Sequence, residues 1–124
     1  MEWTITLHKE DRYCEVVTRG VADKDGSLNM AKAVLLASGK EKIEKVLIDH
    51  RNISAVSGGI LEVYNRPKEL KAAGMEPGVM VAEIVKPEHR KFFDFLETVC
   101  VNRGFLFSVF ENKKEGLDWL LENK

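Results

Sequence analysis

The sequence predicts a single α/β domain, residues 1–124, with a mixed sheet of about five strands and about four helices. Three observations support this fold class. A chain of 124 residues is long enough for one hydrophobic core and too short for two ordinary domains. Apolar and polar residues alternate near the start of the chain, which is typical of a strand hairpin. Helix-like and strand-like segments then alternate, which favours right-handed crossovers between parallel strands.

The opening hairpin is predicted from two alternating segments. Trp3, Ile5 and Leu7 are separated by polar residues, which is the period of a half-buried strand. The segment "YCEVVTRG", residues 13–20, has the composition of a second strand. The charged segment between them is short enough for a hairpin turn, so these strands should form an antiparallel edge of the sheet.

A helix and a strand should follow the hairpin. Residues 23–39 carry apolar side chains at helical spacing, with Asp25 or Ser27 as the N-cap and Gly39 near the end. The run "KVLID", residues 45–49, is short and apolar, like a buried parallel strand.

A second helix is predicted after Gly59, where Ile60, Leu61 and Tyr64 can share one face. Pro67 lacks a backbone donor and its ring clashes with the preceding turn. We therefore expect a break or kink there, with a second helical piece beginning at the proline.

The last part of the chain should form strand 78–85, helix 87–103, strand 105–110 and helix 112–124. Asn112 and Glu115 have the spacing of a capping box at the start of the last helix. The buried stripe of helix 87–103 is assigned to Phe92, Phe95, Leu96 and Val99. Phe93 falls off this stripe and is a candidate for lining a groove.

Composition excludes several functional classes. A net charge of −1 gives no broad basic field, so we do not expect nucleic acid binding. No apolar run approaches the roughly 20 residues of a membrane-spanning helix, and the first residues lack the apolar segment of a secretory signal. Cys14 and Cys100 lie far apart, which indicates two reduced, buried thiols in a cytoplasmic protein. The histidines show no metal-ligand spacing, so neither a metal nor a cofactor is predicted.

The segment Ser57-Gly58-Gly59 is the main candidate site, because it lies between a predicted strand and a predicted helix. Ser57 could cap the helix, and the glycines could satisfy a tight turn. The helix N-terminus could instead bind an anion, or the hydroxyl could be a phospho-acceptor. Caps are much commoner than sites, so the cap is the preferred interpretation.

A hydrolase triad of Asp49, His50 and Ser57 is the least favoured interpretation. The serine lacks the GxSxG elbow, and a histidine seven positions away does not establish a base–nucleophile contact. His50 is expected to end a strand at the polar rim. No enzymatic activity is therefore predicted.

Two segments resemble the STAS domain family, the anti-sigma-factor antagonists and their SpoIIAA-like relatives, whose fold is related to the CRAL/TRIO lipid carriers. The segment "KVLIDHRNISAVSGGIL" is similar to the strand–loop–serine–glycine–helix part of the family. The segment "GVMVAEIVKPEHRKFFDFLETVCVNRGFLFSVFENKKEGLDWLL" is similar to its closing strand–helix–strand–helix part. The similarity covers nearly the whole chain and is closest to the stand-alone SpoIIAA-like branch.

The resemblance implies a regulatory serine at Ser57 or Gly58. In the family, a partner kinase phosphorylates the serine at the helix start and so controls binding. The regulators usually carry Asp-Ser-Ser-Gly there, whereas this chain has Val56 before Ser57 and only one hydroxyl.

We therefore expect a non-enzymatic cytoplasmic binding or signalling module that recognises a partner protein, kinase-like or anti-sigma-like, through residues 52–64. The predicted partner or ligand surface consists of Asn52, Ser54, Ile60, Tyr64 and Phe93. The alternative is a small carrier or sensor of a lipid-like or anionic molecule, with its pocket between the sheet and helices 60–70 and 87–103. The sequence leaves the oligomeric state open.

Overall fold

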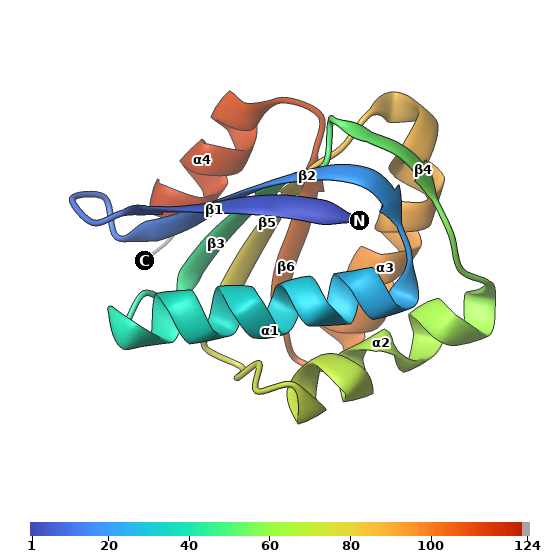
Figure 1. The fold of residues 1–124 in the computed structure, drawn as a ribbon, viewed down its shortest axis with the longest axis horizontal. Coiled ribbons are helices and arrows are strands. Elements are labelled where there is room, and N and C mark those ends of the chain that lie inside the picture. Colours follow the sequence, from blue (N-terminus) through green and yellow to red (C-terminus); the bar gives the residue numbers. More distant parts are fainter. Residues whose placement is uncertain (123–124) are drawn as a thin grey trace.

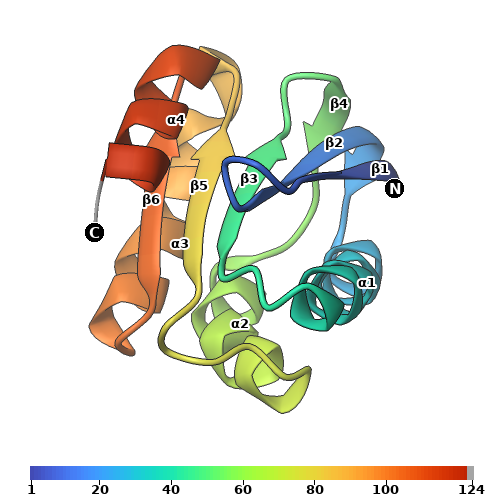
Figure 2. The ribbon, with the colours of Figure 1, turned by 90° about the vertical axis from the view of Figure 1, so that its left-hand side faces the viewer.

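The computed structural model describes residues 1–122 and contains a six-stranded sheet with helices on both faces (Figures 1 and 2). Five strands form a continuous path in the order β1–β2–β3–β5–β6, and β4 pairs with β2 beyond this path. The strands are β1 Glu2–His8, β2 Tyr13–Ala22, β3 Lys45–Asp49, β4 Ile53–Val56, β5 Met80–Ile84 and β6 Leu106–Phe110. Only β1 and β2 pair in antiparallel fashion, which confirms the predicted mixed sheet with its opening hairpin.

Four α-helices cover the two faces of the sheet unequally. They are α1 Lys24–Lys40, α2 Ile60–Ala72, α3 Arg90–Asn102 and α4 Lys113–Glu122, and the short 3-10 helix η1, Pro87–His89, precedes α3. Buried side chains of α1, α2 and α3 form one core cluster with the sheet, and Leu120 of α4 belongs to a second cluster on the other face. No helix within residues 1–122 is long and apolar enough to cross a membrane.

The central strands are buried on both faces, as parallel strands between helices must be. In β3, Val46 and Ile48 belong to the cluster beneath α1, α2 and α3, while Leu47 between them belongs to the cluster beneath α4. In β5, Val81 and Ala82 divide between the clusters in the same way. This explains why these strands are nearly continuous apolar runs in the sequence.

The predicted N-cap of α1 and the predicted loop after β3 are wrong. The cap is Asp23, whose Oδ1 accepts a hydrogen bond from the backbone N of Gly26 at 2.8 Å, and not Asp25 or Ser27. The segment 53–56, interpreted as loop, forms β4. This strand pairs with the end of β2, about 30 residues earlier in the sequence, so a local pattern could not predict it.

The predicted break at Pro67 is also wrong, because α2 runs through it as one helix. The Pro67 ring is fully buried. Proline removes a backbone donor from the helix, and burial of the ring offers a compensating gain that is not visible in a local pattern.

The buried stripe of α3 consists of Phe93, Leu96, Val99 and Cys100, whereas Phe92 and Phe95 are only partly buried. The prediction that Phe93 falls off the stripe is therefore wrong. Apolar residues occupy both stripes at helical spacing, so periodicity alone could not choose between them.

The predicted capping box at the last helix is confirmed in its first half, because Asn112 Oδ1 accepts a hydrogen bond from the backbone N of Glu115 at 2.8 Å. The last helix extends to Glu122. The final two positions of its predicted range lie outside the described residues.

Gly116 allows α4 to pack closely on the sheet. A Cβ atom at this position would lie against Ile84 Cδ1, with Leu47 Cδ1 only 3.3 Å away, whereas a Cβ at Gly39 of α1 would meet nothing within 4 Å. Gly116→Ala should therefore lower the free energy of unfolding by about 1–3 kcal/mol. The matched control Gly39→Ala should raise it by up to about 1 kcal/mol, because alanine favours the helix. Urea unfolding measures both, and a stabilised Gly116→Ala would contradict the close packing.

Candidate functional site

Ser57 does not cap α2, contrary to the preferred interpretation. The N-cap is Gly59, and no side chain hydrogen bonds at this helix start. Ser57 lies two residues earlier, where its backbone N donates to the carbonyl O of Ala22 at 2.9 Å. This bond attaches the loop to the end of β2 and leaves Ser57 exposed. Within residues 1–122, the Ser57 hydroxyl has no hydrogen bond.

The first turn of α2 already contains a negative charge. Glu62 lies in this turn, and its Oε2 is 2.8 Å from the point that a Cβ of residue 58 would occupy. Gly58 has a φ of 137°, a conformation that favours glycine. The Glu62 carboxylate therefore places a negative charge near this helix end, which opposes the binding of an anion there. An anion site at Ser57-Gly58-Gly59 stays a prediction.

The start of α2 exposes three large apolar side chains. Ile60, Leu61 and Tyr64 are 75%, 77% and 52% exposed. The guanidinium carbon of Arg103, at the end of α3, lies 5.6 Å from the centre of the Tyr64 ring. Asn52 and Ser54 are exposed in the preceding segment. We call Ile60, Leu61 and Tyr64 the α2 apolar patch.

Phe93 was assigned to the same surface, and the structure contradicts this. The side chain is only 2% exposed. Its ring stacks on that of His50, with 4.9 Å between ring centres, and lines an internal cavity. The groove predicted for Phe93 is thus a cavity within the core and no part of the α2 surface.

His50 is buried, and not at the polar rim as predicted. Its Nδ1 lies 2.7 Å from Thr18 Oγ1, and its Nε2 lies 3.0 Å from Glu83 Oε2. Both ring nitrogens are therefore occupied, and neither is directed to Ser57. Asp49 instead binds Arg51, with 2.8 Å between Oδ2 and Nη2. The structure does not assemble Asp49, His50 and Ser57 into a triad.

The hydroxyl of Thr18 has one proton and two acceptors within reach. The carbonyl O of Asp49 lies 3.2 Å away, farther than His50 Nδ1. Donation to Nδ1 leaves the ring proton on Nε2, which then donates to Glu83. Donation to Asp49 would require a second proton shared between His50 and Glu83. The shorter distance favours the first arrangement, in which Thr18 donates to His50 Nδ1 and His50 Nε2 donates to Glu83.

The Asp49 carboxylate is held ionised beside the hydrogen-bonded side chains of Thr18, His50 and Glu83. Burial opposes ionisation, but hydrogen bonds from the Arg51 side chain and backbone outweigh it, so the pKa of Asp49 is lowered. This carboxylate therefore belongs to a local ion pair.

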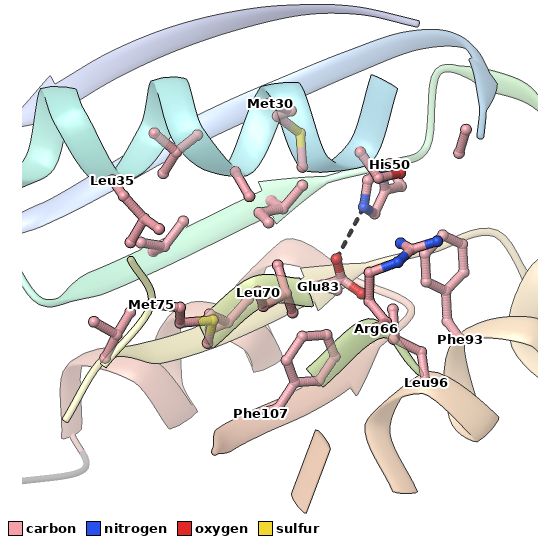
Figure 3. Close-up of a pocket in the computed structure, with 18 of the residues that line it drawn as sticks. Met30, Leu35, His50, Arg66, Leu70, Met75, Glu83, Phe93, Leu96 and Phe107 are labelled. Carbon is pink, nitrogen blue, oxygen red and sulfur yellow. Dashed lines mark hydrogen bonds and ion pairs between the residues drawn. The ribbon is translucent and has the colours of Figure 1, made fainter. Parts of the chain in front are cut away.

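Arg66 of α2 and Glu83 of β5 add two unpaired polar atoms to the site. Arg66 Nε and Glu83 Oε1 are buried, and neither has a hydrogen-bond partner in the described chain. Both side chains line a cavity of about 70 Å³ between the sheet and helices α1, α2 and α3. Figure 3 shows His50, Glu83, Arg66 and Phe93 together at one end of this cavity, with Leu35 and Met75 at the other.

The two cysteines are free and buried, as predicted. Burial raises the pKa of the Cys100 thiol to about 12; nearby Glu83 contributes to this and Arg66 opposes it. Burial also raises the pKa of Cys14 to about 11. Both thiols therefore stay protonated and unreactive near neutral pH. Among residues 1–122, no group of three or more His, Cys, Asp or Glu side chains could hold a metal ion.

Sequence reasoning missed Thr18, Arg66 and Glu83. Glu83 had a usable signal, because it is the one charged residue in the otherwise apolar run "GVMVAEIV". A charge in a strand buried on both faces requires a partner. Arg66 and Thr18 lie among other polar residues, so their burial could not be read from composition.

Comparisons with known proteins confirm the predicted fold. No family model and no curated protein matches the chain. An uncharacterised DUF3478-family protein with a SpoIIAA-like fold from Shewanella loihica is 22% identical, with a TM-score of 0.58 over 96% of this chain and 92% of that one. The anti-sigma factor antagonist SpoIIAA in its unphosphorylated form is 13% identical, with a TM-score of 0.56 over 99% and 100%. An anti-sigma factor antagonist from Mycobacterium paratuberculosis is also 13% identical, with a TM-score of 0.60 over 96% and 94%. At these identities the similarity shows the SpoIIAA-like fold.

The buried hydrogen bond of Thr18 can be tested by removing the hydroxyl. Thr18→Val leaves His50 Nδ1 buried without a partner, which should lower the free energy of unfolding by about 1–3 kcal/mol. The matched control is Thr98→Val, because the Thr98 side chain is exposed and its hydroxyl donates to the backbone carbonyl O of Asp94. The control should change stability by no more than about 0.5 kcal/mol. Equal effects at both positions in urea unfolding would exclude a special role for the buried bond.

The absence of a cap at Ser57 gives a second stability test. Ser57→Ala should change the free energy of unfolding by no more than about 0.5 kcal/mol, since the hydroxyl bonds nothing in residues 1–122. Asp23→Ala removes the side chain that does cap a helix and should cost about 0.5–2 kcal/mol. A loss of 1 kcal/mol or more at Ser57, about the usual value of a cap, would restore the cap interpretation.

Proposed function

We propose that the protein is a non-enzymatic signalling module of the STAS type that acts in the cytoplasm and recognises a partner protein through residues 52–64. The observation that carries this proposal is the α2 apolar patch. Exposed apolar side chains are ordinarily scattered, whereas a concentration of them indicates an interaction surface. Here three of them occupy the first five residues of one helix.

The chemistry of the patch suits a protein partner. Tyr64 offers a large amphipathic ring, and Arg103 places a cation over it. Tyrosine and arginine are enriched among residues that dominate binding energy, and aliphatic neighbours exclude water around them. The polar side chains of Asn52 and Ser54 would form the rim of such an interface.

The fold comparison supports a regulatory role. Two of the solved structures with this fold are named anti-sigma factor antagonists. Ser57 is exposed beside the patch, so its hydroxyl is open to a kinase. Phosphorylation would add about −1.5 to −2 charges next to Glu62 and the patch, which would repel an acidic partner.

The patch can be tested with two matched charge insertions. Leu61→Glu puts a charge into the patch, and Leu36→Glu puts the same charge on α1, where Leu36 is 66% exposed. Both variants should melt within a few degrees of the wild type. Partner capture from the native cell extract, quantified by mass spectrometry, should fall about 10-fold or more with Leu61→Glu alone.

Direct binding to the purified captured protein then decides the role. A higher Kd for Leu61→Glu, with an unchanged Kd for Leu36→Glu, supports the proposed surface. Equal affinities for the wild type and both variants would refute it. In the same assay, weaker binding by Ser57→Asp than by Ser57→Ala would support phosphorylation control.

A further inference from the structure

The interior of the molecule contains a second feature that the α2 surface does not explain. Arg66 is 95% buried, since only 5% of its surface is exposed. Within residues 1–122, its side chain makes no hydrogen bond and no ion pair, and its Nε is inaccessible. A buried donor without a partner is costly, because it gives up its hydration without a replacement. The Nε–H of Arg66 is therefore available to a bound molecule.

Glu83 provides an acceptor at the same end of the cavity. Its Oε2 is occupied by His50 Nε2, while its Oε1 has no partner among the described residues. Figure 3 shows the Arg66 and Glu83 side chains next to each other in the cavity wall. A molecule that satisfies both must accept hydrogen bonds from the guanidinium and donate one to a carboxylate.

Apart from Ser27 and His50, the other residues that line the cavity are apolar. They include Met30, Val34, Leu35, Leu70, Met75 and Val79. Leu35, Leu70 and Val79 are partly exposed, so this part of the cavity wall borders the surface of the molecule. The flexible thioether side chains of Met30 and Met75 can adapt to an alkyl chain.

The volume limits the size of the molecule. About 70 Å³ is several times the roughly 10–15 Å³ needed for one water molecule. It is about half of the roughly 150 Å³ apolar cavity that binds benzene. A molecule of six or seven non-hydrogen atoms therefore requires the flexible side chains of Met30 and Met75 to move, whereas a long acyl chain would have to displace the helices.

We propose that this cavity binds a short aliphatic α-hydroxycarboxylate. The carboxylate accepts hydrogen bonds from Arg66, in the two-pronged geometry that guanidinium groups favour. The hydroxyl of the ligand donates a hydrogen bond to Glu83 Oε1 and so satisfies this buried acceptor. The alkyl chain lies among the apolar residues of α1, α2 and the sheet. This site is separate from residues 52–64 and does not depend on a partner protein.

Calorimetric titration of the full chain with four probes tests the assignment. The probes are α-hydroxybutyrate, butyrate, butanol and butylamine, which differ in the head group. We expect saturable binding of α-hydroxybutyrate, several-fold weaker binding of butyrate, and at least 10-fold weaker binding of butanol and butylamine. Lengthening the acid to α-hydroxyoctanoate should weaken binding, because of the limited volume.

Three variants locate the binding. Arg66→Met should weaken α-hydroxybutyrate binding at least 10-fold, and Lys71→Met, which removes an exposed charge from the same helix, should leave it unchanged. Ala31→Leu fills the apolar part of the cavity without altering the polar residues and should also abolish binding. If Arg66→Met does not fold, Ala31→Leu and the head-group series decide the question.

Several results would overturn the proposal. They are the absence of saturable binding by either acid, equal binding of butanol and the acids, or full binding by Ala31→Leu. A crystal structure grown with α-hydroxybutyrate that showed only water at Arg66 and Glu83 would do the same.

Discussion

A buried chain of hydrogen bonds joins the three neighbouring strands at the centre of the sheet. Thr18 lies on β2, His50 follows β3, and Glu83 lies on β5. In an apolar interior each of these groups requires its partner, so a one-residue shift of any strand would leave buried donors and acceptors unpaired. These hydrogen bonds therefore help to fix the register of the three strands. Phe93, stacked on His50, brings α3 into the same arrangement.

The two faces of the sheet consequently have different characters. Beneath α4 the core is apolar and closely packed, with Gly116 allowing the helix to approach Ile84. Beneath α1, α2 and α3 the core contains the hydrogen-bonded chain, the Arg66 guanidinium and a cavity. Two buried polar atoms without a hydrogen-bond partner in the described chain, Arg66 Nε and Glu83 Oε1, also lie on this face.

The sequence was informative where a local signal determines structure, except at the α1 N-cap, which is Asp23 and not Asp25 or Ser27. The strand at 45–49, the opening hairpin and the Asn112 cap depend on alternation, short turns or side chains three positions apart, and these were predicted. Errors arose where a distant residue decides. The backbone N of Ser57 donates a hydrogen bond to the carbonyl O of Ala22, and β4 pairs with the distant end of β2. His50 looked like a polar strand end because its partners lie more than 30 positions away on either side.

Helix α2 carries both proposed sites on opposite sides. Ile60, Leu61 and Tyr64 are exposed, whereas Val63, Arg66 and Pro67 are buried against the core. A molecule in the cavity would touch the helix that presents the patch. Linkage then sets a strict condition on any communication between the two sites. The cavity molecule can change partner affinity only if it binds differently to the partner-bound and free forms, and the partner must change the affinity of the cavity by the same factor. Because α2 contributes Arg66 to the cavity and Tyr64 to the patch, a small rigid shift of this helix would alter both sites together.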